Sequence, residues 1–250
     1  SQLLQIMGNA AAVTDRSFAV PDGVHNGHYG IGIVIDFFGL AGKYSGFPVD
    51  FVYPSMTSVV PANIALIAGG KNPDEAKKFM AFSMSTEGQQ LLFDPKISRL
   101  PILPYSQLKA PAGYPDPQEV AKRAKEKKKT DLSEARYQVV TSLFDQMVTF
   151  RLKELQGATQ AIQDAEKALK AKLNARGSGR VKQARALAYT PLVGAENVKN
   201  EQFLELFRKS RRDVEVSKQL SGQEQLWANK ARENYARAQQ LATEARGLAK

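Results

Sequence analysis

Apolar residues form short continuous runs in the first hundred residues and recur at helical spacing in the second half. Residues 30–38 are almost uninterrupted apolar positions, and residues 49–53 form a shorter run. Such runs are typical of strands covered on both faces of a parallel sheet. Residues 72–75 and 85–87 are typical helix starts, each with a polar cap followed by an acidic residue. These patterns together predict an α/β segment over residues 1–105.

The second half is predicted to be helical. A seven-residue apolar repeat runs through Val148, Leu155, Ile162 and Leu169. A second apolar stripe comprises Trp227, Ala231, Tyr235, Ala238, Leu241, Ala242, Ala245 and Leu248. We expect the two stripes to pack as an antiparallel helix pair, because neither would be stable alone at a surface. Residues 175–179 are expected to break the helices, and Asp131 with Glu134 and Ser221 with Glu224 are expected to start helices.

The balance of charged residues changes near the boundary between the predicted α/β segment and the predicted helical half. Residues 1–116 contain 8 Lys and Arg against 9 Asp and Glu, whereas residues 117–250 contain 27 against 16. A proline-rich stretch, 104–117, lies at the change and is followed by a basic run at 122–129. The expected organisation is an α/β domain over 1–105, a Pro-rich and basic linker over 106–130, and an all-α helical extension over 131–250.

Composition excludes several classes of function. No segment reaches 18 uninterrupted apolar residues, so the sequence predicts no membrane-spanning helix. The chain has no cysteine, and no nucleophile–base–acid set emerges, so we expect no enzyme, no cofactor and no metal. His25 and His28 lie among glycines and lack a cluster of acidic ligands. The basic run lacks interleaved aromatic residues, so no nucleic-acid partner is expected.

Three polar residues precede a short predicted helix at 18–24. Thr14, Arg16 and Ser17 follow a small-residue loop. Free backbone N–H groups at a helix start, together with hydroxyls and a guanidinium, can converge on one oxyanion. The alternative is that Thr14 or Ser17 only caps the helix and that Arg16 is solvated.

Further polar residues follow the two predicted strands. Asp36 ends the first apolar strand, and a carboxylate beside such a run needs a hydrogen-bond partner. That partner is either a ligand hydroxyl or the backbone of the next turn. Tyr53, Ser55 and Thr57 follow the second strand and offer more hydroxyls, although Pro54 also makes this segment a hydroxyl-rich turn.

Through segments 7–18, 30–38, 52–61 and 98–101, the chain resembles the C-terminal part of periplasmic solute-binding proteins of ABC importers. The resemblance is to the branch with the iron(III) binders, the hexose-phosphate binders and the phosphoglycerate regulatory proteins. It implies a partial lobe of the periplasmic-binding-protein type II fold, also called the Venus-flytrap fold, with half of the cleft outside this sequence. We therefore expect residues 31–35 to expose apolar surface.

The resemblance implies a periplasmic protein that binds a small anionic, phosphorylated solute and delivers it to an ABC permease in the inner membrane. In that interpretation Thr14, Arg16 and Ser17 hold the anion, and Asp36 accepts from a ligand hydroxyl. Hexose-phosphate binders pair this aspartate with a preceding histidine, where this chain has Ile35. The alternatives are a periplasmic regulatory protein that signals ligand occupancy to a membrane sensor kinase, and an iron(III)-binding protein. Iron binders use adjacent tyrosines, which this chain lacks.

Overall fold

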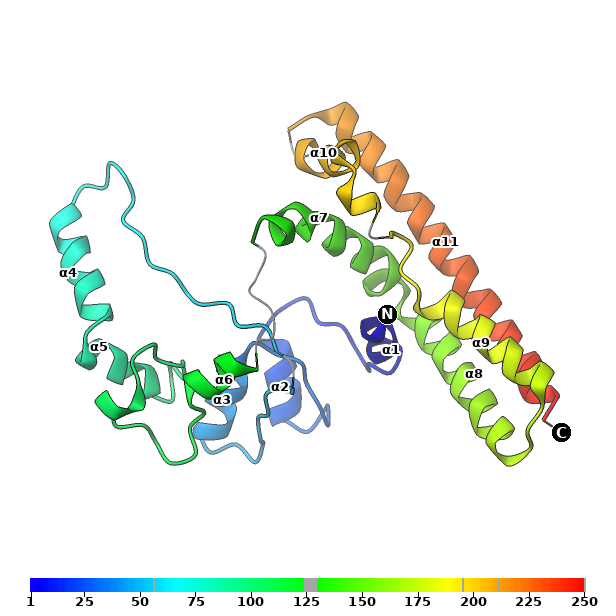
Figure 1. Cartoon of the computed structure of the whole chain (residues 1–250), viewed down its shortest axis with the longest axis horizontal. Helices are drawn as coiled ribbons and strands as arrows, with labels where there is room; N and C mark the ends of the chain where they lie inside the picture. Colours follow the sequence, from blue (N-terminus) through cyan, green and yellow to red (C-terminus); the bar gives the residue numbers. More distant parts are fainter. Residues whose placement is uncertain (56, 124–129, 195, 211, 250) are drawn as a thin grey trace. The chain divides into compact units, whose positions relative to one another are not determined.

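The computed structural model describes residues 1–55, 57–123, 130–194, 196–210 and 212–249. The chain forms two compact units, which are described separately (Figure 1). The helical unit contains Ser1–Val13 and Lys129–Lys250, and the loop-rich unit contains Thr14–Lys128. This division differs from the expected one, because the first 13 residues fold with the C-terminal helices.

Three long helices form the centre of the helical unit. Its elements are α1 (Gln2–Met7), α7 (Thr130–Met147), η3 (Thr149–Arg151), α8 (Leu152–Ala171), α9 (Ala175–Tyr189), η4 (Asn197–Lys199), α10 (Glu201–Lys209) and α11 (Val214–Gly247). All four members of the predicted seven-residue repeat are buried, which confirms that the repeat marks the core. Fully buried alanines fill the contacts between α8, α9 and α11: Ala158, Ala165, Ala184, Ala188, Ala231, Ala238, Ala242 and Ala245.

Helices α8 and α11 run in the same direction, so the expectation of an antiparallel pair is wrong (Figure 1). The Tyr235 hydroxyl donates to the Met147 carbonyl at 2.8 Å, just before α8 begins. Further along both helices, Arg246 Nη1 lies 3.5 Å from Asp164 Oδ2. The contact near the start of α8 thus involves an earlier residue of α11 than the contact further along α8, which shows that the two helices are parallel. The two apolar stripes do pack together, but as a parallel pair.

Helix α9 supplies the antiparallel partner that the sequence analysis missed. It begins at Ala175, inside the segment expected to be a break. A Cβ at Gly177 would stand only 2.8 Å from Leu169 Cδ2, so glycine lets the first turn of α9 lie close to the end of α8. Later in α9, Arg185 Nη1 meets Glu166 Oε1 at 2.9 Å. Gly177 thus allows a tight helix–helix contact, and α9 runs back along α8.

Helix α11 begins earlier than the pair Ser221 and Glu224 predicted. Its N-cap is Asp213, whose Oδ1 accepts from the Glu215 backbone N–H at 2.9 Å. Ser221 and Glu224 lie inside the helix, and Glu224 accepts a hydrogen bond from Ser142 Oγ at 2.6 Å. The prediction of a helix start there is wrong, because Ser and Glu three residues apart also share one face within a helix.

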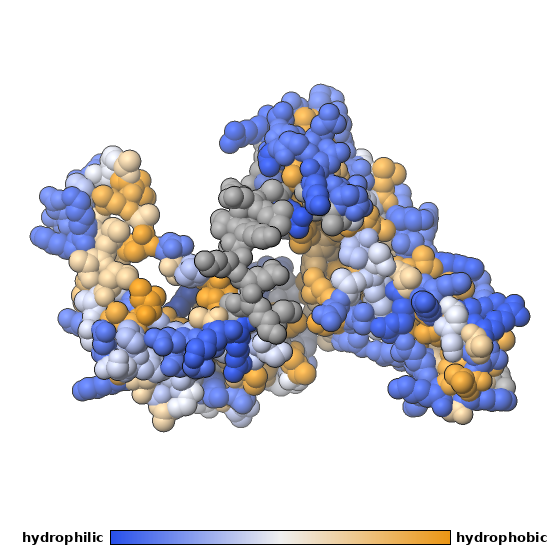
Figure 2. Space-filling view, viewed as in Figure 1, coloured by the Kyte–Doolittle hydropathy of each residue, from blue (hydrophilic) through white to orange (hydrophobic). Residues whose placement is uncertain are grey.

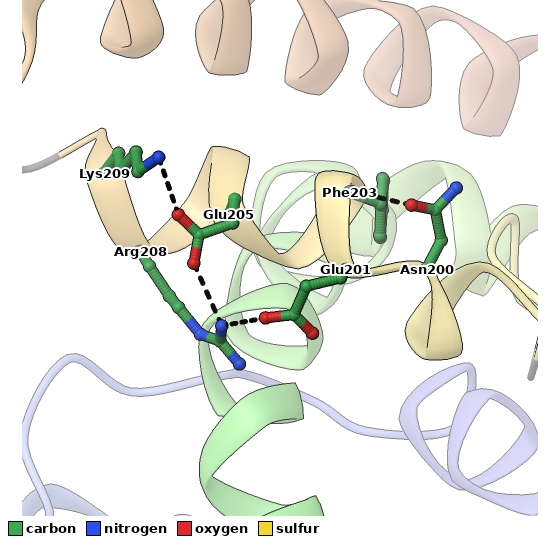
Figure 3. A network of polar contacts seen from close by, with 6 residues as sticks. All are labelled: Asn200, Glu201, Phe203, Glu205, Arg208 and Lys209. Atoms are coloured by element: carbon green, nitrogen blue, oxygen red, sulfur yellow. Dashed lines mark hydrogen bonds and ion pairs between the residues drawn. The ribbon is translucent and has the colours of Figure 1, made fainter.

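Helix α10 has one apolar and one charged face. Phe207 is buried and stacks on Trp227 with ring centroids 6.0 Å apart. On the charged face Arg208 pairs with Glu201 and, at 3.0 Å, with Glu205 (Figure 3). These exposed pairs contribute little stability individually. The buried apolar face, with Leu204 and Phe207, therefore attaches α10 to its neighbours.

Helix α1 and the loop that follows it are fastened to α8 and α9. Leu4 is buried in the main core of the helical unit. Gln156 Nε2 donates to the Ala10 carbonyl at 2.7 Å, and Gln163 Nε2 donates to Asn9 Oδ1 at 2.7 Å. The N-terminal residues are therefore an integral part of the helical unit, although they are separated in sequence from its other helices by the whole loop-rich unit.

The loop-rich unit has short helices joined by long extended segments. They are α2 (Ala19–His25), α3 (Asp36–Tyr44), α4 (Pro73–Ser83), α5 (Thr86–Gln90), η1 (Leu91–Phe93), η2 (Tyr105–Gln107) and α6 (Pro117–Lys122). The predicted starts of α4 and α5 are confirmed, and Ser85 Oγ accepts from the Gly88 N–H as expected of a cap. The Asn72 side chain, expected to cap α4, makes no capping hydrogen bond. The small core of this unit contains Leu40, Phe93 and Tyr114.

The described residues contain no strand, so the predicted α/β fold and its type II lobe are wrong. Residues 30–35 form neither strand nor helix, and the run continues as helix α3 from Asp36. Residues 49–53 likewise have no regular secondary structure. A strand needs a neighbour for its backbone hydrogen bonds, and a continuous apolar run is also compatible with a helix.

Apolar side chains of the loop-rich unit are open to solvent, as expected for residues 31–35. Ile31 is 89% exposed, and Ile33 and Ile35 are also largely exposed. Figure 2 shows further hydrophobic side chains around α4 and the segment leading into it. Helix α4 buries none of its residues, and Phe79 is exposed.

Two further expectations concern the linker and the membrane. The predicted basic run at 122–129 falls mostly on residues 124–129, which lie outside the described part of the chain. Helix α6 lies within the expected linker and is capped by Asp116, which accepts from the Gln118 N–H at 2.8 Å. None of the helices that the structure describes is both long and apolar enough to cross a bilayer.

Truncating the central repeat should destabilise the helical unit. We expect Leu155→Ala or Ile162→Ala to lower the free energy of unfolding by about 2–5 kcal/mol, because both side chains are fully buried and would leave a cavity. Urea unfolding followed by circular dichroism measures this change. Val140→Ala, at an exposed position of α7, should stay within about 0.5 kcal/mol of the unsubstituted chain. Equal effects at all three positions would contradict the assigned core.

Candidate functional site

The structure brings together two of the predicted site residues, Asp36 and Tyr53. The Tyr53 hydroxyl donates to Asp36 Oδ2 at 2.9 Å, and the Phe37 backbone N–H donates to Asp36 Oδ1 at 2.9 Å. Asp36 is the first residue of α3, where the helix dipole favours a carboxylate. Each carboxylate oxygen can accept a second hydrogen bond. Asp36 is therefore held in place by the chain and retains capacity to accept from a hydroxyl.

Arg99 places a cation over Phe37, the residue that follows Asp36. Its guanidinium carbon lies 3.6 Å from the centroid of the Phe37 ring, a cation–π contact, and the residue is exposed. The preceding Ser98 is fully buried and has a positive φ of 48°. A left-handed backbone is strained for serine and persists only where surrounding contacts enforce it. The enforced turn at Ser98 thus fixes where Arg99 leaves the core.

Tyrosines surround the Asp36–Tyr53 pair from inside the unit. The Tyr44 and Tyr114 rings have centroids 4.7 Å apart, and the Tyr105 hydroxyl donates to the Pro115 carbonyl at 2.5 Å. The Tyr44 hydroxyl is buried and has no hydrogen-bond partner among the described residues. The candidate site therefore consists of one carboxylate and one guanidinium above a layer of phenols.

Burial raises the pKa of three phenols in and around the pair: Tyr53, Tyr105 and Tyr114. It is the main cause that raises the pKa of Tyr53, and the hydrogen bond to Asp36 raises it further. Burial likewise raises the pKa of Tyr105, and it raises the pKa of Tyr114 to about 12. At neutral pH all three hydroxyls are hydrogen-bond donors rather than phenolate ligands.

The other predicted anion ligands lie in a solvated loop before α2. The Arg16 side chain is 82% exposed, and its Nε lies 3.9 Å from Asp15 Oδ2. Thr14 Oγ1 donates to the Arg16 carbonyl at 3.1 Å. The N-cap of α2 is Phe18, which makes no side-chain capping bond, so neither Thr14 nor Ser17 caps this helix. The expected convergence of two hydroxyls and a guanidinium at a helix start does not occur here.

The remaining predicted residues flank Tyr53. Ser55 is exposed and Thr57 is half-buried, and neither makes a hydrogen bond to another described residue. Arg123, near the end of α6, donates from Nη1 to the Tyr53 carbonyl at 3.1 Å. Arg123 and Arg99 were missed, since sequence spacing gives no reason to place Arg123 at Tyr53 or Arg99 at Phe37.

A separate polar hollow lies in the helical unit. Its volume is about 520 Å³, and it is lined by polar residues that include Asn9, Lys153, Gln156, Gln160 and Gln163. The amides that line it already bond to one another and to neighbouring backbone, so this hollow is not the candidate site. In the described part of the chain, no group of three His, Asp or Glu residues is placed to hold a metal ion.

The chain is similar to curated regulatory proteins of transport. It is 30% identical over 210 residues to the phosphoglycerate transport regulatory protein PgtC of Salmonella typhimurium (strain LT2), and equally to PgtC of Salmonella typhi. Each match covers 82% of this chain and 48% of the relative, so the chain spans about half the length of the curated relatives it matches. No family model matches the chain, and no solved structure does.

The raised phenol pKa values predict loss of stability at alkaline pH. Tyr114 has a pKa of about 12 when folded and 10.0 when unperturbed, so folding retains its proton. Its stabilising contribution is complete below about pH 10 and is lost as the pH rises towards 12. Urea unfolding from pH 9 upward should therefore show a declining free energy, and Tyr114→Phe should flatten this decline. Tyr137→Phe, at an exposed tyrosine, serves as the control and should not.

Proposed function

We propose that this chain is part of a regulator of solute transport that recognises a small phosphorylated acid and reports its binding to a membrane partner. The similarity to the two PgtC proteins carries this proposal. The match spans 210 residues, which is more than either compact unit contains, so it includes parts of both. The relatives' name favours regulation, the alternative interpretation of the sequence, over delivery of a solute to a permease.

The chemistry of the candidate site and of the loop before α2 supports a ligand of the phosphoglycerate type. Such a ligand offers a phosphate, a carboxylate and a hydroxyl. Arg99 of the site and Arg16 of the loop are exposed, and guanidinium groups bind phosphate and carboxylate with paired hydrogen bonds. Asp36 retains capacity to accept from a hydroxyl. An iron(III) ligand is less favoured, because the buried phenols resist the deprotonation that iron coordination requires.

The connection between the units supports a reporting role. Residues 1–13 are fastened to α8 by Gln156 and Gln163, and Thr14 follows directly in the chain. A ligand that orders the loop at Thr14, Arg16 and Ser17 would therefore act on a segment whose other end is anchored in the helical unit. The proposal includes a sensor kinase in the membrane as partner, a periplasmic location and a relationship to the solute-binding proteins of ABC importers.

Removing a guanidinium should weaken binding of a phosphorylated acid. We expect Arg16→Ala and Arg99→Ala each to raise the dissociation constant for 3-phosphoglycerate about ten- to a hundredfold, since a charge-assisted hydrogen bond contributes about 1.5–3 kcal/mol. Arg16→Lys should recover only part of the affinity, because an ammonium cannot make the two-pronged contact. Titration calorimetry on the full-length protein measures these constants, with Arg212→Ala in the helical unit as control.

The same titration distinguishes the competing ligands. Hexose phosphate and ferric iron are titrated alongside 3-phosphoglycerate. Iron binding that survives Arg16→Ala and Arg99→Ala, without binding of any phosphate ester, would replace the phosphate proposal with the iron alternative. Regulation and delivery are separated by gene neighbours: a kinase and response regulator support regulation, whereas a permease and ATPase alone support delivery.

A further inference from the structure

We infer that the end of the helical unit at the α8–α9 turn docks onto a membrane surface rich in anionic lipids. This surface, which we call the basic tip, consists of Lys167, Lys170, Lys172, Leu173, Arg176 and Lys182. All six residues are exposed. Figure 2 shows hydrophilic side chains around a small hydrophobic patch over this end of the unit.

The charge of the basic tip has one sign. From position 167 to position 195 the sequence contains seven Lys and Arg and no Asp or Glu. Two of the seven are neutralised from outside this segment: Arg180 by Glu244 and Arg185 by Glu166. Four others form no ion pair with another described residue: Lys167, Lys170, Arg176 and Lys182. The charges of α10, by contrast, pair with one another.

Arg176 stands where helix stability favours the opposite charge. It lies in the first turn of α9, and that turn contains no acidic residue. The N-terminus of a helix carries a partial positive charge, so a cation there is mildly destabilising. Lys170 lies in the last turn of α8, where a cation stabilises the helix, so its position is explained by folding alone. The position of Arg176 opposes helix stability, and a bound anion would reverse this effect.

Leu173 is the apolar apex of the basic tip and is 85% exposed. It lies in the short connection between α8, which ends at Ala171, and α9. Asn174 makes this connection rigid: its Oδ1 accepts from the Gly177 N–H at 2.9 Å, and its Nδ2 donates to the Leu248 carbonyl at 3.2 Å. The turn is thus tied to both α9 and the end of α11, and Leu173 is held outside the core.

A lipid surface matches both features of the basic tip. Lys and Arg side chains are attracted to anionic headgroups, while an apolar side chain gains by entering the acyl boundary. A nucleic acid would satisfy the charges, but its phosphate backbone offers no place for an aliphatic apex. Binding of single strands also uses exposed aromatic rings, whereas Tyr189 in this segment is buried. The combination favours the membrane.

Vesicle binding by the whole chain tests the inference. Because the chain has no cysteine, Leu173→Cys accepts a single environment-sensitive dye. We expect a blue shift of that dye with vesicles of phosphatidylcholine and phosphatidylglycerol, and none with phosphatidylcholine alone. In flotation, Lys170→Ala and Arg176→Ala should each weaken binding about fivefold, and Leu173→Ala about tenfold. Thermal unfolding of Arg176→Ala should show unchanged or higher stability, so lost binding cannot be attributed to misfolding.

Leu226 and Lys230 on α11 provide the matched control, because Leu226 is 64% exposed and also has a lysine close by in sequence. Leu226→Ala and Lys230→Ala should leave vesicle binding unchanged, and a dye at Leu226→Cys should not shift. Equal losses in the control variants would overturn the inference. A second result would also overturn the inference: duplex DNA or polyglutamate binds through Lys170 and Arg176, while the dye at position 173 shows no shift with vesicles. Exposed isoleucines of the loop-rich unit cannot mimic the result, since they would bind neutral vesicles equally.

Discussion

The close contact of α8, α9 and α11 is the constraint on which the helical unit depends. Alanine dominates these interfaces, and a small side chain lets helix backbones approach until their ridges interlock. Close approach then fixes everything attached to the three helices. Tyr235 reaches the Met147 carbonyl only because α11 lies against the start of α8, and Asn174 reaches Leu248 only because the helices end together. Larger residues at the alanine positions would separate the helices and remove these hydrogen bonds.

The sequence predicts the buried residues of this core well, but it predicts the relative direction of α8 and α11 poorly. A seven-residue repeat states which face of a helix is buried, and Leu155 and Ile162 are buried accordingly. It does not state which helix covers that face or in which direction the partner runs. The direction followed from α9, whose glycines at 177 and 179 are typical of a break in a helix. Gly177 instead permits a close helix contact, and one of its neighbours there, Ala245, is distant in sequence.

The loop-rich unit shows the opposite case, in which local signals hold and the pattern of apolar runs misleads. Ser85 caps α5 because a cap depends on residues within one turn. The apolar run at 30–38 is compatible with a strand or a helix, and which of the two forms depends on whether another segment pairs with it. None is paired with it in the described structure, so Ile31 remains exposed and α3 takes the rest of the run. The contact of Arg99 with Phe37, the residue after Asp36, was likewise beyond sequence spacing, since the two residues are 62 positions apart and the enforced turn at Ser98 places the arginine.

Charged residues are paired on α10 but largely unpaired on the basic tip at the α8–α9 turn. The first arrangement is compatible with folding alone, whereas the second indicates recognition of a partner. On α10, Arg208 meets Glu201 and Glu205 on its own helix, so the surface is close to neutral over short distances (Figure 3). On the basic tip, Lys170 and Arg176 form no ion pair with another described residue, and Arg176 opposes its helix dipole. A fold gains nothing from such an arrangement, because unpaired like charges repel each other. It becomes favourable only when an external anionic surface supplies the missing charge, which is why a function for this end follows from its electrostatics and not from its packing.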